Sequence, residues 1–109
     1  MSRNIRRIER MCQETGGNFI NTQDRMGRLG VCEVGQGHKI RVHDNSEIIL
    51  DREEDEIAIE PHQMKQEGNN IVVDGISGYV SDGSTRHHIT GGKATVNRSG
   101  ISYEERNRY

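Results

Sequence analysis

Four arginines stand within the first ten residues and form the clearest chemical pattern of the chain. A guanidinium group binds a phosphate or a carboxylate through two parallel hydrogen bonds, so a row of arginines is a candidate surface for nucleic acid or acidic protein. At 100° per residue, the four side chains fall within an arc of about 100° on one side of a helix. The row consists of Arg3, Arg6, Arg7 and Arg10.

The complementary charge lies in the middle of the chain. Residues 44–60 carry eight acidic side chains against Arg52 alone, whereas residues 1–30 carry six arginines against three acids. We expect the arginine row either to be solvated or to meet these acids, from the same chain, a second copy or another protein. Such exposed pairs add less than about 1 kcal/mol each, but they orient partners. The densest acids are Glu53, Glu54, Asp55 and Glu56.

Nucleic acid is the alternative partner of the arginines, with Arg25 and Arg28 added to the four of the row. Contacts between arginines and phosphates would make binding steeply dependent on salt. Against this alternative, the chain has a net charge of −2, and no aromatic residue stands among the arginines to stack on bases. We therefore rank nucleic acid below protein as the partner.

Histidine spacing predicts no metal site. His87 and His88 are adjacent, so on a strand their side chains point to opposite faces. His38 and His43 are five residues apart and also fall on opposite faces of a regular strand. The acids of residues 51–56 are too consecutive to predict a general acid and base in contrasting environments. We expect no catalytic residue, no metal ligand, no cofactor and no small-molecule substrate.

The two cysteines, Cys12 and Cys32, belong to no Cys-x-x-Cys pair. We expect two free, partly buried thiols in a reducing compartment, with a disulfide as the alternative. The arginines of the N-terminus precede no long apolar run, so the sequence predicts neither a signal peptide nor a membrane span. The expected location is the cytoplasm, or a particle assembled there.

An amphipathic helix over residues 3–14 would position the arginine row. Ile5, Ile8, Met11 and Cys12 fall on the side opposite the arginines, and the glycine pair of residues 16–17 can end the helix. A helix of this length is marginal alone, so its apolar side must pack on another element.

Strands are the expected partners of this helix. Twelve isoleucines and seven valines stand against two leucines, and β-branched side chains favour pleated sheet. Alternating apolar residues predict a first strand group in residues 28–60, with strands at 28–34, 38–43, 47–50 and 56–60.

A second strand group is expected in residues 69–103, where glycine turn signals recur at residues 74–75, 82–83, 91–92 and 99–100. These signals predict a meander of short antiparallel strands. A short β-solenoid or an intertwined oligomeric β-prism is the alternative. Residues 104–109 are highly charged, and we expect them to fray.

The sequence thus predicts one α+β domain, mainly β, over residues 1–109. Ile, Val, Leu and Phe together number 22, about one fifth of the chain, which is a small supply for a core. The domain is therefore expected either to be marginally stable or to complete its core against another chain, and the single Phe, three Tyr and absent Trp favour the second alternative. The expected core residues are Ile5, Ile8, Met11, Val31, Ile40, Val42, Ile48, Leu50, Ile57, Ile59, Ile71, Val73, Val80, Ile89, Val96 and Ile101.

These features favour a non-catalytic protein-binding or assembly module that forms a homo-oligomer, binds another protein, or does both. A small structural component or inhibitor from a virus or mobile element would fit this description. The alternative function is a nucleic-acid-binding regulator that uses the arginine-bearing helix.

Overall fold

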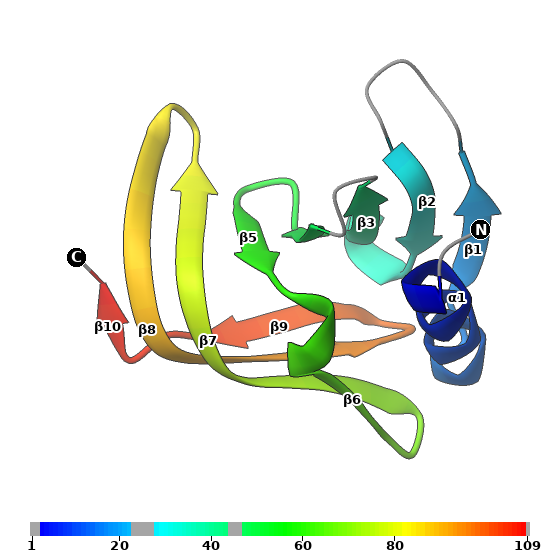
Figure 1. Cartoon of the computed structure of the whole chain (residues 1–109). Coiled ribbons are helices and arrows are strands. Elements are labelled where there is room, and N and C mark those ends of the chain that lie inside the picture. The colour runs from blue at the N-terminus through cyan, green and yellow to red at the C-terminus, as the bar shows by residue number, and fades with distance from the viewer. Residues whose placement is uncertain (1–2, 23–27, 44–46, 109) are drawn as a thin grey trace.

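The described residues, which are 3–22, 28–43 and 47–108 of a computed structural model, contain one α-helix, two short 3-10 helices and ten strands. Figure 1 shows a strongly curled sheet with the helix at one end. In chain order the elements are α1 (Arg3–Thr15), β1 (Asn18–Asn21), β2 (Arg28–Glu33), the short 3-10 helix η1 (Gly35–Gly37), β3 (Lys39–His43), β4 (Ile48–Asp51), β5 (Glu56–Ile59), the short 3-10 helix η2 (Pro61–Gln63), β6 (Met64–Glu67), β7 (Asn70–Asp82), β8 (Thr85–Asn97), β9 (Gly100–Glu104) and β10 (Asn107–Arg108).

Helix α1 packs against β1, β2 and β7 through its apolar side. Ile5, Ile8, Met11 and Cys12 are buried there. The helix ends where the sequence predicts, because the N–H of Gly17 donates to the carbonyl of Cys12 and the N–H of Gly16 to the carbonyl of Gln13. These two bonds satisfy carbonyls that the last turn of a helix leaves without partners.

All the described strand pairs are antiparallel, which confirms a mainly-β α+β fold and replaces the β-solenoid alternative. The strands run in the order β1-β2-β3-β4-β5-β7-β8-β10, while β6 pairs with β7 and β9 with β8. The two longest strands, β7 and β8, pair with each other along their length. One end of this pair is flanked by β6 and β9, and the other end by β5 and β10. The first and second halves of β7 and β8 run in different directions in Figure 1, and this bend curls the sheet around its core.

Two of the expected turns are bends within β7 and β8. Gly75 has a φ of +65° and Gly91 a φ of +79°, values that favour glycine. The pairing of β7 with β8 shifts register around Ile76, which is buried at the bend. The prediction of turns at residues 74–75 and 91–92 was therefore wrong, because a glycine with positive φ serves a bulge as well as a turn.

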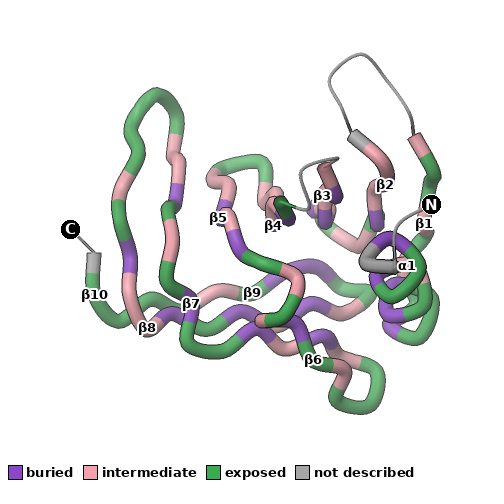
Figure 2. The backbone as a smooth tube through the Cα atoms, viewed as in Figure 1, coloured by how far each residue is buried: buried purple, intermediate pink, exposed green. Residues whose placement is uncertain are grey.

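A single chain encloses its core. Every expected core residue is buried except Val31, which is half-buried. Five further residues join the core, namely Cys12, Cys32, Met64, Ile76 and Ala94. Figure 2 shows buried residues alternating with half-buried and exposed residues along the strands. Most core side chains are fully buried within this one chain, so their burial gives no support to the expectation that another chain completes the core.

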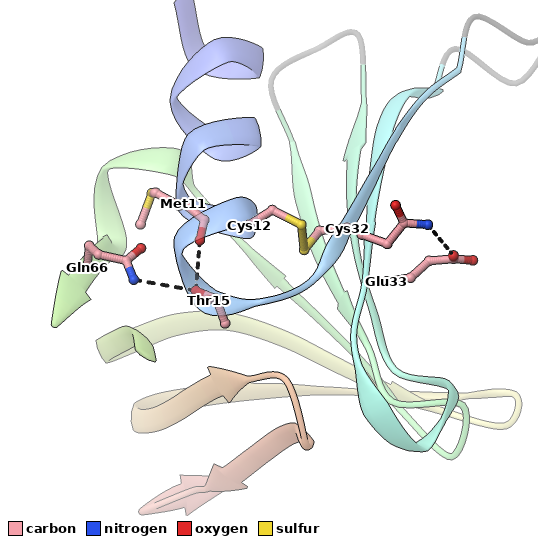
Figure 3. The surroundings of a disulfide bond; sticks show 7 residues. Met11, Cys12, Thr15, Cys32, Glu33 and Gln66 are labelled. Carbon is pink, nitrogen blue, oxygen red and sulfur yellow. Dashed lines mark hydrogen bonds between the residues drawn. A yellow bond between two sulfur atoms is a disulfide. The ribbon is translucent and has the colours of Figure 1, made fainter. Parts of the chain in front are cut away.

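The expectation of free thiols was also wrong, because Cys12 and Cys32 form a disulfide (Figure 3). The bond joins α1 to β2, with the two Cα atoms 5.9 Å apart and a sequence separation of 20 residues. The disulfide packs on Gly17, where an added Cβ would lie 2.9 Å from the sulfur of Cys32 and 3.0 Å from that of Cys12.

Three strands arise where the sequence predicts none. β1 lies in the polar segment after the helix, and β6 lies between the two predicted strand groups. The C-terminal residues 104–109, which we expected to fray, include β10, and β10 pairs with β8 at Thr90 and Ile89. No helix within the described ranges is both long and apolar enough to cross a membrane.

Candidate functional site

The arginines of the row do not all have the same surroundings on α1. Arg6 and Arg10 are exposed, and neither forms an ion pair with a described residue. Arg7 instead reaches η2 and the start of β6, where it donates to the carbonyl of Pro61 at 2.8 Å and to that of Met64. Arg3 lies in α1 and Arg28 in β2, whereas Arg25 is outside the described residues.

The acidic run pairs with arginines of the sheet. Arg41 on β3 contacts Asp51 at 3.3 Å and both carboxylate oxygens of Glu56, the shorter contact being 2.7 Å. Because Asp51 is on β4 and Glu56 on β5, these contacts hold three neighbouring strands together. The described ion pairs of Asp51 and Glu56 therefore support the sheet.

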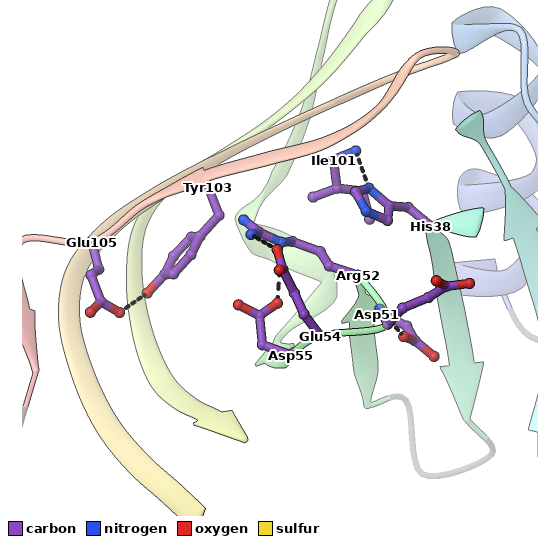
Figure 4. A network of polar contacts seen from close by, with 9 residues as sticks. His38, Asp51, Arg52, Glu54, Asp55, Ile101, Tyr103 and Glu105 are labelled. Atoms are coloured by element: carbon purple, nitrogen blue, oxygen red, sulfur yellow. Dashed lines mark hydrogen bonds and ion pairs between the residues drawn. The ribbon is translucent and has the colours of Figure 1, made fainter. Parts of the chain in front are cut away.

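The loop between β4 and β5 has its own cation, Arg52 (Figure 4). Its guanidinium contacts Glu54 at 2.6 Å and Asp55 at 3.2 Å, and it lies 5.8 Å from the ring centre of Tyr103 on β9. Glu53 has a positive φ of 72°, and its N–H donates to the side chain of Asp51. Three of the four acids proposed as an interaction site, Glu54, Asp55 and Glu56, thus have arginine partners within the chain.

A different group of side chains offers an exposed surface. Tyr79 on β7 is 43% exposed, one of two exposed large hydrophobic residues in the described chain. The guanidinium of Arg86 on β8 lies over the tyrosine ring, 4.0 Å from its centre, and the ring of His88 lies 5.3 Å away. The strand register explains this cluster, since Tyr79 is directly opposite His88, and Arg86 is two residues from His88 on the same face.

The cluster borders a concavity where β5 and β7 separate. These strands pair only between Glu56 and Ser81 and between Ile57 and Val80. Beyond these pairs lies an open concavity of about 970 Å³. Its lining includes Arg7, Glu47, Ala58, Ile59, Glu60, Pro61, His62, Ser77, Gly78, Tyr79 and Arg86.

The lining combines both charge signs with one aromatic ring. Glu60 and His62, both largely exposed, lie 3.3 Å apart at its rim. Arg7 and Arg86 add positive charge, and Glu47 adds negative charge. No three His, Cys, Asp or Glu side chains gather as a metal site in the described part of the chain. The mixed lining suits contact with a protein surface, because aromatic and arginine side chains are the commonest anchors of such contacts.

Sequence reasoning missed Tyr79 and Arg86, although a signal for the tyrosine was present. Val80 was expected in the core, and alternation along a strand then places its neighbour Tyr79 on the outer face. The position of Arg86 beside the ring depends on the register of β7 and β8, and the sequence did not specify this register.

Comparisons of this chain with protein-family models, with curated proteins and with solved structures gave no match.

Proposed function

We propose that this chain is a non-catalytic protein-binding and assembly module, with copies of itself or another protein as partners. The observation that carries this proposal is the exposed Tyr79 beneath Arg86 at the edge of the concavity. Stacking on the guanidinium holds the ring in place, so a partner would bind it at a small cost in side-chain entropy. Arg6 and Arg10 remain available on α1 to orient an acidic partner.

The disulfide bears on where the module acts. Buried disulfides are rare in the reducing cytoplasm and common in proteins outside it. Of the two locations expected from the sequence, a particle assembled in the cytoplasm agrees better with the pairing of Cys12 and Cys32, because such a particle can carry the chain out of the reducing compartment. A structural component of a viral or mobile-element particle is therefore the form of the proposal that we favour over an inhibitor.

A photo-crosslinking residue in place of Tyr79 tests the proposed surface in the cells that produce the protein. We expect a covalent adduct with one defined protein, identified by mass spectrometry, and we expect Arg86→Glu to abolish it. The matched control places the same residue at Lys65, which is exposed on β6 outside the concavity. Identical adducts from both positions, or none from either, would contradict the proposal.

Nucleic acid stays the second candidate because Arg7 and Arg86 line the same concavity as an exposed aromatic ring. Arginines and a stacking aromatic are the usual components of a single-strand binding surface. Titration of labelled single-stranded RNA and DNA at low and high salt separates the two functions. Binding at low salt that weakens steeply as salt rises would favour nucleic acid, and absence of binding at low salt would remove it.

A further inference from the structure

We propose that two copies of this chain associate through β1, which joins their sheets edge to edge about a two-fold axis. The inference rests on the proposed assembly function and names the surface and partner for self-association. Among the described residues β1 pairs with β2 alone, so it ends the sheet. Figure 1 shows it at the opposite end of the sheet from β10.

The composition of β1 distinguishes it from the other edge strands. Its residues, Asn18, Phe19, Ile20 and Asn21, include no charge and no proline. By contrast, β6 carries Lys65 and Glu67, β9 carries Glu104, and β10 carries Arg108. Natural sheets protect exposed edges with charged residues, prolines or bulges. The β1 edge has none of these three protections, as expected for a strand that pairs with another chain.

Ile20 is the second of the two exposed large hydrophobic residues, at 40% exposure. It lies opposite Val31 of β2 on the outer face of the sheet, and Val31 is only half-buried. A strand added beyond β1 would cover Ile20 and extend this apolar row. The proposed pairing would therefore explain why Ile20 is exposed.

The hydrogen-bond pattern of β1 fixes the register of the pairing. The N–H of Thr22 donates to the carbonyl of Leu29, so this pair is of the hydrogen-bonded kind. Because hydrogen-bonded and non-hydrogen-bonded pairs alternate in an antiparallel ladder, Ile20 is also bonded to β2. Phe19 and Asn21 then direct their backbone N–H and C=O groups towards the open edge.

Two copies satisfy these groups only in certain registers. If Phe19 of each copy faces Asn21 of the other, each such pair gains two backbone hydrogen bonds. Ile20 then faces Ile20 of the second copy as a non-hydrogen-bonded pair, the kind in which side chains lie closest. The outer face of each sheet stays outer in this arrangement. The apolar row becomes continuous from Val31 of one copy to Val31 of the other.

Cysteine cross-linking tests this register. Ile20→Cys should give a disulfide-linked dimer on mild oxidation, whereas Asn18→Cys, on the same strand and face, should not. We expect the linked fraction to differ by about tenfold or more, because Cα atoms over about 7 Å apart cannot be bridged without backbone movement. Peptide mapping checks that Cys12 and Cys32 stay paired. Equal cross-linking of both variants, or none for Ile20→Cys, would overturn the proposal.

Light scattering provides the second measurement. The wild type should approach twice the chain mass of 12.4 kDa as concentration rises. Ile20→Lys should stay at the monomer mass while keeping the circular dichroism spectrum of the wild type. Tyr79→Lys, which changes the other exposed hydrophobic residue, should still dimerise. A monomeric wild type would overturn the β1 dimer and leave the Tyr79 adduct experiment to decide the proposed function separately.

Discussion

His38 is one of two buried polar residues in the described chain, and its ring connects two distant segments. It stands just before β3, and its Nδ1 accepts the backbone N–H of Ile101 on β9 at 2.8 Å (Figure 4). Nearby, the N–H of Gly35 donates to the carbonyl of Arg98. The first strand group is thereby joined to the turn that begins β9. His38, whose spacing from His43 predicts no metal site, is therefore a structural hydrogen-bond acceptor.

Replacing this ring should weaken the fold. In His38→Ala the N–H of Ile101 loses its acceptor in a buried place, which costs about 1–3 kcal/mol of unfolding free energy. Urea unfolding followed by circular dichroism measures the loss, and the Ile101 amide should exchange its hydrogen faster. His62→Ala is the matched control, because its side chain is 76% exposed. Equal midpoints for the two variants would contradict the assigned role.

Arg7 and Arg6 are neighbours in sequence with different expected effects on stability. Arg7 donates to two carbonyls around η2, whereas Arg6 is exposed without a described partner. We expect Arg7→Ala to lower the unfolding free energy by about 1 kcal/mol, the usual net contribution of a hydrogen bond. Arg6→Ala should change it by less than about 0.5 kcal/mol, as is usual for a surface position. The same urea series compares them, and a larger loss for Arg6→Ala would refute this distinction.

Among the secondary-structure elements, those with a strong periodic pattern were predictable and those defined by pairing were not. Helix α1 and strands β3 and β5 begin and end within one residue of the predicted positions. Their buried sides are marked in the sequence by alternation or helical spacing of isoleucines. β1 has no buried residue, and β6 has only Met64. A strand of four residues with so little apolar pattern depends on its neighbour, so only the tertiary structure reveals it.

The same limit applies to the bends and to the disulfide. A glycine at a bulge and a glycine in a turn both adopt positive φ, so Gly75 and Gly91 gave the same sequence signal as Gly83. Cys12 and Cys32 lie twenty residues apart, and only the packing of α1 on β2 brings them together. The Tyr79 concavity was beyond prediction for a similar reason, because it depends on where β5 and β7 separate.

The disulfide is the strongest link between α1 and the sheet. By the chain-entropy relation, a closed loop of about twenty residues stabilises the fold by about 3 kcal/mol. The double variant Cys12→Ala, Cys32→Ala should lose that amount in urea unfolding. Reductant should destabilise the wild type by a similar amount and leave the double variant unaffected. A wild type that reductant does not weaken, even after prolonged unfolding, would contradict the pairing.

At the scale of the whole molecule, the completeness of the core separates folding from association. Side chains from α1 and from the strands of the curled sheet bury one another within a single chain. Some of the charged side chains also have partners within the chain. Arg41 and Arg52 pair with acids of the acidic run, and Arg7 donates to carbonyls around η2. The association that we propose would therefore be a property of the surface, and it should be removable while the fold is kept.

Ile20→Lys tests this independence. Because Ile20 lies on an edge strand and is 40% exposed, the substitution removes no core contact. We expect its unfolding free energy as a monomer to stay within about 0.5 kcal/mol of the dilute wild type, as is usual for surface substitutions. Its urea midpoint should be the same at low and high protein concentration, whereas that of the wild type should rise with concentration, because dimer formation stabilises the folded state by mass action. A variant that unfolds without denaturant would show that the second copy is needed for folding, and the single-chain core would then be insufficient to hold this fold.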